Sequence, residues 1–228
     1  MYEFVRGPLM WISFIIFIVG LSYQLYRLIT LTRSKDIVRI GDDEEPPPRI
    51  SKLIWKRLVR KIKDWSVMRK GTILGTQPLL ALLTTVFHIC LIITPLFLVA
   101  HNVLLFESWH CSLPSFAERT TDILTVIVLL GASIFLIRRL FVPRVRAISS
   151  LYDYLLLLIT LAPFITGYMA YHQMMDYETI IIAHILAGEI MLVAIGVTKL
   201  SHMIFYFFVR FFIGSEYSFR GGNRTWQY

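Results

Sequence analysis

The stretch TIIIAHILAGEIMLVAIGVTKLSHMIFYFFV, residues 179–209, is long, mostly apolar and carries two histidines. His184 and His202 are 18 residues apart, and a spacing of this length makes five whole turns of an α-helix. On one continuous helix both rings would project from the same face, roughly 27 Å apart along the axis. That separation is close to the thickness of a bilayer's hydrocarbon core. The pattern therefore predicts a membrane-spanning helix with one histidine near each side of the membrane.

The composition extends this prediction to the whole chain. Of the 228 residues, 56% are hydrophobic and only 17% are charged, and the charges cluster so that long apolar runs remain. Such runs cross a bilayer as α-helices, which satisfy their own backbone hydrogen bonds. We expect an all-α integral membrane protein, a single membrane domain over residues 1–228 built as a five-helix bundle. The expected spans are 8–30, 79–105, 122–140, 152–171 and 179–209.

The distribution of positive charge predicts the orientation of the bundle. Of the 23 Lys and Arg, only Arg6 and Arg119 fall at the N-terminus or in the loops 106–121 and 172–179. Because cytoplasmic loops carry the excess of Lys and Arg, we expect the N-terminus outside and the C-terminus in the cytoplasm. The net charge of +8 thus comes from residues at the ends of the spans, beside the membrane surface, and nucleic acid is not an expected partner.

The polar segment between the first two spans predicts an additional helix. Between residues 50 and 70, apolar residues recur at three- and four-residue steps with Lys and Arg between them. This periodicity is typical of a cytoplasmic amphipathic helix. Two interpretations stay open, a helix lying on the lipid headgroups and a helix docking a partner subunit.

The second span carries two further histidines, His88 and His101. In the expected orientation His88 and His202 lie near the cytoplasm, and His101 and His184 lie near the outside. Each pair would supply two axial ligands to one planar cofactor, for which haem b is the expected occupant. On a straight helix His88 and His101 would point about 140° apart, so Pro95 is expected to bend the helix between them.

Other cofactors fit the residue types less well. A zinc site needs ligands that converge on one ion, and His184 and His202, five turns apart, do not converge. The chain has two cysteines and no Cys-x-x-Cys-His motif, which argues against c-type haem and iron–sulfur clusters. A different class stays open: a haem-free membrane anchor, or a transporter whose histidines bind protons or metal.

A second group of residues indicates a quinone or proton site. At the outer end of the fourth span, His172 could take a proton while Tyr168 and Tyr171 enclose a quinone such as menaquinone. The alternative is an ordinary aromatic belt at the interface. Glu189 lies about 140° round the helix from His184 and is expected to face another helix, as a neutral acid or as a proton relay. No catalytic residue is expected otherwise, so any active site would be confined to quinol oxidation or quinone reduction.

Several motifs carry a resemblance to a known family. The sequence LIRRLFVPRVR, residues 136–146, followed by Asp153, resembles the turn between spans three and four in the γ (cytochrome b) subunits of respiratory nitrate reductases. The VFH that ends at His88 and the spacing of His184 and His202 resemble the haem-ligand positions of that family. PLFLVAH (95–101), PFITG (163–167) and TKLSH (198–202) are more similar to the membrane cytochrome b subunits of the Tmc, Hmc and Dsr redox complexes of sulfate-reducing bacteria.

This resemblance implies a di-haem cytochrome b subunit of a respiratory redox complex in a bacterial or archaeal cytoplasmic membrane. It implies electron passage between a quinone pool or a periplasmic multihaem cytochrome c and a cytoplasmic iron–sulfur subunit resembling heterodisulfide reductase, beside other membrane subunits and lipid. The chain departs from the nitrate reductase pattern at two points. In that family the outer ligand of the second span lies closer in sequence to the first histidine than His101 does to His88. The position of the basic residue that the family uses near its quinol site falls near Glu118 and Arg119 in this chain.

Overall fold

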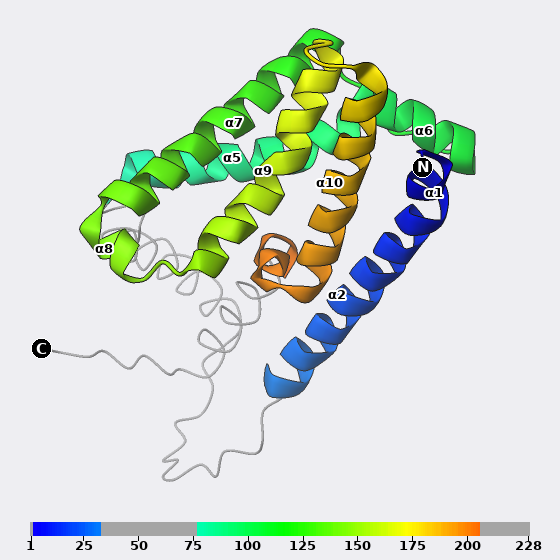
Figure 1. The fold of residues 1–228 in the computed structure, drawn as a ribbon. Helices are drawn as coiled ribbons and strands as arrows, with labels where there is room; N and C mark the ends of the chain where they lie inside the picture. The colour runs from blue at the N-terminus through cyan, green and yellow to red at the C-terminus, as the bar shows by residue number, and fades with distance from the viewer. Residues whose placement is uncertain (1, 33–76, 206–228) are drawn as a thin grey trace, which may run out of the picture. The chain divides into compact units, whose positions relative to one another are not determined.

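The computed structural model describes residues 2–32 and 77–205, and every regular element in these ranges is a helix. Five of the helices are long and apolar enough to cross a membrane, which confirms, for the described residues, a helical fold with five helices able to span a bilayer (Figure 1). The expected amphipathic helix at 50–70 and the last residues of the fifth span, 206–209, lie outside the described residues. The described elements are α1 (Tyr2–Phe4), the π-helical turn η1 (Val5–Leu9), α2 (Met10–Thr32), α5 (Pro78–Phe97), α6 (Val99–Trp109), α7 (Glu118–Phe141), α8 (Pro143–Ala147), α9 (Leu151–Tyr171), α10 (Tyr177–Val197) and the 3₁₀ turn η2 (Lys199–Ser201).

The chain divides into two units within the described ranges. The first unit comprises residues 2–32 and 128–205, and the second comprises residues 77–127. In the first unit α9 and α10 form an antiparallel pair joined by a short loop, and α2 packs along α10 in the same direction (Figure 1).

Local capping explains where the two helices of this pair begin. The backbone N–H of Ser150 donates to Asp153 Oδ2 at 2.8 Å, as part of a reciprocal capping box that starts α9. At the start of α10, Asp176 Oδ2 accepts the backbone N–H of Thr179 at 3.0 Å. Both carboxylates satisfy donors that the first turn of a helix leaves without intrahelical partners.

Two glycines allow α2 and α10 to approach each other closely. A Cβ placed on Gly20 would lie 2.5 Å from the carbonyl oxygen of Gly196, and one on Gly196 would lie 2.9 Å from the Cα of Phe17. Real Cβ atoms do not come this close to backbone, so only glycine fits at either position. Small residues at a crossing are the usual means of bringing membrane helices into contact.

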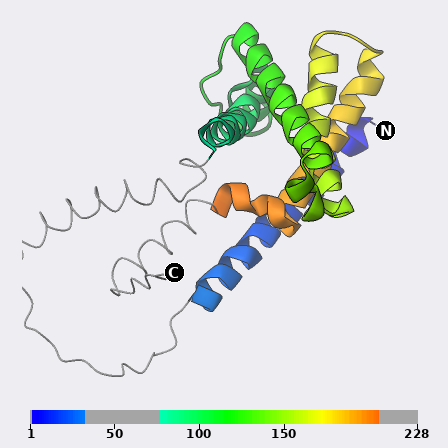
Figure 2. The same ribbon diagram turned by 90° about the vertical axis from the view of Figure 1, so that its left-hand side faces the viewer.

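The expectation of one continuous helix over 179–209 is wrong. Helix α10 ends at Val197 because Thr198 has extended backbone angles, φ −118° and ψ −178°, and after η2 the chain turns away from the direction of α10 (Figure 2). His184 and His202 therefore do not lie on one helix. The shared face and the separation of about 27 Å expected for five continuous turns do not apply.

Side chains satisfy the backbone groups that this break releases. Gln24 on α2 donates from Nε2 to the carbonyl oxygen of Gly196 at 2.5 Å, and its Oε1 accepts from the hydroxyl of Ser201. The hydroxyl of Thr198 accepts the backbone N–H of Leu200 at 3.2 Å and so caps η2. Such compensation is what makes irregular backbone tolerable within a membrane.

The second unit also contains a break where one span was expected over 79–105. The sequence predicted a bend at Pro95, whereas α5 and α6 are separate helices on either side of Leu98, whose ψ is 131°. Asn102 Nδ2 donates to the carbonyls of Leu96 and Leu98 at 3.1 and 3.2 Å, and its Oδ1 accepts the backbone N–H of Leu113 at 3.0 Å. A buried asparagine thus joins the two helices and the loop that follows.

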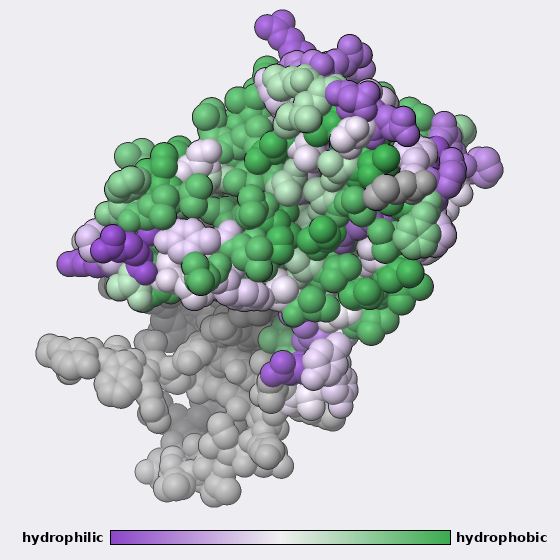
Figure 3. Space-filling model, in the orientation of Figure 1, coloured by the Kyte–Doolittle hydropathy of each residue, from purple (hydrophilic) through white to green (hydrophobic). Residues whose placement is uncertain are grey.

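The exposed faces of the spans are hydrophobic, as a lipid environment requires. Figure 3 shows apolar side chains over most of the visible surface, with hydrophilic side chains gathered towards the helix ends. On α2, Trp11, Ile15, Ile18 and Val19 are each more than half exposed. Exposing this much apolar surface to water would be unfavourable, so the faces are suited to lipid or to other membrane subunits.

Candidate functional site

The four histidines proposed as ligands share one feature, a close contact between ring Nδ1 and a main-chain carbonyl oxygen. His88 and His101 lie on α5 and α6 in the second unit, whereas His184 on α10 and His202 after η2 lie in the first. The contacts are His88 with Thr84 at 2.7 Å, His101 with Pro95 at 2.8 Å, His184 with Pro163 at 2.9 Å and His202 with Lys199 at 2.7 Å.

This contact fixes the tautomer of each ring. Because a carbonyl oxygen can only accept a hydrogen bond, Nδ1 must carry the proton. In a neutral imidazole the lone pair then lies on Nε2, and the hydrogen bond both orients the ring and raises its basicity as a ligand. The four rings are therefore in the form that suits coordination of haem iron through Nε2. The pairing of His88 with His202, and of His101 with His184, stays a prediction.

His184 has the most closely fitted surroundings of the four. Its half-buried ring packs against Gly167 of α9, where an added Cβ would lie 2.9 Å from Cε1 and 3.1 Å from Nδ1 of the imidazole. The hydroxyl of Thr166 donates to the carbonyl of Ala162 at 2.7 Å, so its oxygen is available to the His184 Nδ1–H at 3.3 Å. The PFITG segment of α9 thus supplies the carbonyl, the hydroxyl and the space that hold this ring.

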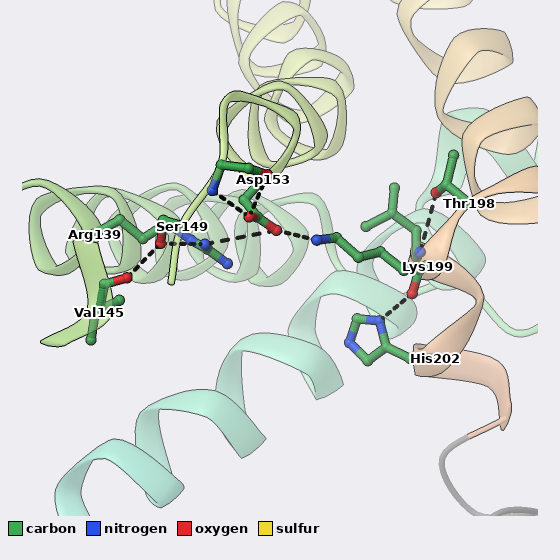
Figure 4. Close-up of polar contacts among 9 residues, drawn as sticks. Arg139, Val145, Ser149, Asp153, Thr198, Lys199 and His202 are labelled. Carbon is green, nitrogen blue, oxygen red and sulfur yellow. Dashed lines mark hydrogen bonds and ion pairs between the residues drawn. The ribbon is translucent and has the colours of Figure 1, made fainter. Parts of the chain in front are cut away.

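His202 lies exposed beside a polar cluster formed by α7, α8, α9 and η2 (Figure 4). Its Nδ1 donates to the carbonyl of Lys199, and the ammonium group of Lys199 is paired with Asp153 Oδ1. Arg139 lies 4.0 Å from the same carboxylate oxygen and donates to the hydroxyl of Ser149 at 3.0 Å. The cluster links the turn that carries His202 to the first turn of α9.

Of the predicted quinone residues, the structure brings three together. The ring of His172 lies 4.2 Å from that of Tyr168 and 5.0 Å from that of Tyr171, measured between centroids, at the exposed end of α9. Glu189 does not belong to this group. It lies 12 residues after Tyr177, the first residue of α10, which is roughly 18 Å along the helix axis.

Glu189 is instead buried within the first unit, where it is 4% exposed. It precedes Gly196, which contacts α2, by seven residues, and two residues so spaced share nearly one face of a helix. This register agrees with the expectation that Glu189 faces another helix. Neither carboxyl oxygen has a hydrogen-bond partner among the described residues, and burying an isolated charge in such a place is costly.

Sequence spacing did not identify two contributors to these sites. Gly167 and the Asp153–Lys199 pair occur in the motifs that carry the resemblance, but their contacts join different helices. Residues 153 and 199 are 46 positions apart, so no periodicity relates them. Among residues 2–32 and 77–205, no three or more His, Cys, Asp or Glu side chains come together to hold a metal ion. Since bis-histidine haem takes two side chains per iron, this finding concerns sites of the zinc type.

Together these features define an all-helical, multi-pass membrane protein with oriented imidazoles on several helices. The chain belongs to the same family as a protein of Nitratidesulfovibrio vulgaris (strain Hildenborough), to which it is 34% identical over 225 residues, covering 99% of this chain and 97% of the relative. The description of that relative, "Protein", states no activity. No family model and no solved structure matches the chain.

Proposed function

We propose that this protein is a di-haem b cytochrome, the membrane subunit of a respiratory redox complex. The observation that supports the proposal best is the shared state of His88, His101, His184 and His202, each with Nδ1 bonded to a main-chain carbonyl. Ligand histidines in metalloproteins almost always donate their other ring N–H in this way. Four such rings would hold two haems, with two rings to each haem.

The chain's own residues would bind and orient the cofactor. His88 and His202 would hold one haem, and His101 and His184 the other, each through Nε2. A bound haem supplies a one-electron carrier whose potential depends on its axial ligands and their hydrogen bonds. The main-chain carbonyls hold the ligand protons on Nδ1.

The proposed setting is the cytoplasmic membrane of a bacterium or archaeon, with the N-terminus outside. The haem of His88 and His202 would lie near the cytoplasm. It would exchange electrons with an iron–sulfur subunit resembling heterodisulfide reductase. The other haem would exchange electrons with a quinone, such as menaquinone, at His172 or with a periplasmic multihaem cytochrome c. Reporter fusions to each loop test this orientation, and a cytoplasmic N-terminus would reverse the assigned haem depths.

The decisive experiment is a reduced-minus-oxidised absorption spectrum of the purified protein, combined with haem quantification. We expect a b-type α-band and two haems per chain. Replacing His88 or His202 with Ala should remove one haem, and replacing His101 or His184 should remove the other. A wild-type protein without a b-type band would refute the proposal in favour of the haem-free anchor or transporter.

His110 provides a matched control for these replacements. It is an exposed histidine that ends α6 with φ of 52°, and its ring packs against Phe106. The proposal assigns it no ligand role, so His110→Ala should retain both haems. Loss of haem in this variant would show that the histidine replacements disturb folding rather than ligation.

A further inference from the structure

We infer that the ion pair between Asp153 and Lys199 is a positioning device for His202, which holds its imidazole in the orientation and tautomer required of a ligand. This inference rests on the proposed role of His202 in haem binding. It assigns a task to two charged residues to which the proposed function gives no role as ligands.

The geometry runs in a chain from α9 to the ring. Asp153 Oδ2 is held by the backbone N–H and the hydroxyl of Ser150 at 2.8 and 2.9 Å, which leaves Oδ1 directed at the ammonium group of Lys199. The same ammonium lies 5.1 Å from the ring centroid of Tyr152. Asp153 and Tyr152, the two partners of this ammonium group, belong to the first turn of α9 and so fix the position of Lys199. The main-chain carbonyl of Lys199 in turn accepts the hydrogen bond from His202 Nδ1 at 2.7 Å.

The position of this pair makes a purely stabilising role a weak explanation. The side chain of Lys199 is 54% exposed, and ion pairs accessible to water contribute little to stability because solvent screens them. The pair instead joins a capped helix end to a three-residue 3₁₀ turn, which follows the break at Thr198 and is tied to α2 by the hydrogen bond between Ser201 and Gln24. What the pair restricts is the position of that turn, and with it the ring of His202.

Four substitutions separate positioning from charge and from capping. Lys199→Met removes the ion pair and leaves the cap of α9 intact. Asp153→Asn removes the carboxylate from the ion pair and from the cap of α9. Asp153→Glu keeps the charge and the capping box, in which Glu is the favoured residue. Asp176→Asn is the matched control, since Asp176 caps α10 through Thr179.

The first measurement is the low-spin ferric EPR signal of the haem bound by His202 in the purified protein. Release of the ring should broaden this signal in Lys199→Met and Asp153→Asn, whereas Asp153→Glu should restore the wild-type shape and Asp176→Asn should retain it. The midpoint potential of the same haem separates positioning from charge, because Lys199→Met removes a positive charge and Asp153→Asn removes a negative one. Potentials that move in opposite directions with unchanged EPR signals would show that the pair acts by charge alone and would overturn the inference.

The second measurement uses haem-free protein and distinguishes the inference from the proposed function. Nitrogen NMR of labelled histidine should show a single Nδ1-protonated tautomer for His202 in the wild type, and a mixture of tautomers in Lys199→Met and Asp153→Asn. The same single tautomer in all three proteins would overturn positioning, whatever the haem content. A wild type with an oriented ring but no b-type spectrum would refute the haem proposal while leaving the positioning of His202 established.

Discussion

Gly167→Ala provides a sharp test of the site around His184. The added methyl group would lie 2.9 Å from Cε1 of the imidazole and 3.1 Å from its Nδ1. Carbon atoms in contact prefer a separation of about 3.5 Å or more, so the ring must retreat by about 0.6 Å. The ring is the mobile end of a side chain, so it moves more easily than the backbone of α9.

The retreat is large enough to disrupt the hydrogen bond of the ring. The Nδ1 of His184 lies 2.9 Å from the carbonyl of Pro163, and a displacement of this size away from α9 stretches the contact to about 3.5 Å, the limit of a useful bond. Loss of a hydrogen bond that orients a metal ligand typically costs about 10- to 100-fold in metal affinity. We therefore expect one haem to be weakly held or lost and the other to be retained.

The assay is a haem titration of the purified variant, with the EPR signals of the two haems recorded separately. Gly188→Ala is the matched control, because Gly188 also lies within a membrane helix and an added Cβ there meets nothing within 4 Å. This control should bind two haems and be as stable as the wild type or slightly more so, since Ala favours a helix over Gly by about 1 kcal/mol. A Gly167→Ala protein with both haems bound at wild-type affinity would refute the reasoning.

Three further predictions concern other parts of the first unit. Gly20→Ala forces a methyl group against the backbone of α10 and should destabilise the protein by about 1–3 kcal/mol in reversible unfolding, whereas Gly7→Ala, which meets nothing within 4 Å, should not. Hydrogen bonds from the backbone and hydroxyl of Thr179 hold the pKa of Asp176 below its ordinary value. The cap therefore stabilises α10 fully when the pH is above the ordinary pKa, and this contribution is lost as the pH falls through the lowered pKa. The protection factors for hydrogen exchange at the first turn of α10 should therefore fall below about pH 4, and Asp176→Asn should remove this dependence. His172→Ala should keep both haems but lose reduction by a menaquinol analogue; unchanged kinetics would exclude His172 from a quinol site.

The five spans could be predicted because their signal is local. A run of about 20 apolar residues identifies a transmembrane helix without knowledge of its neighbours, and each expected span corresponds to a helix or to a pair of helices. The histidines within the runs were visible for the same reason, because a polar side chain stands out in an apolar segment.

The two helix breaks could not be located in the same way. Pro95 indicated a bend, but the interruption falls at Leu98, where Asn102 supplies hydrogen bonds to released carbonyls. The break at Thr198 follows the weak helix former Gly196 and uses a hydroxyl cap, two features that favour a helix end. The 18-residue spacing of the histidines concealed it, because counting turns presupposes a continuous helix.

The breaks raise an alternative explanation for the histidine contacts, namely that the rings satisfy backbone carbonyls where a helix is interrupted. His101 follows the break at Leu98 and bonds to Pro95, and His202 follows the break at Thr198 and bonds to Lys199. Capping could account for these two contacts.

Capping does not account for the other two histidines. The ring of His88 bonds to Thr84 within α5, four residues earlier and well inside a continuous helix, and the ring of His184 bonds across to Pro163 in the middle of α9. Neither carbonyl lies at a helix end. What all four rings have in common is a proton held on Nδ1 by an oxygen that can only accept. Ligation through Nε2 would account for this arrangement at all four positions, whereas helix capping accounts for it at two.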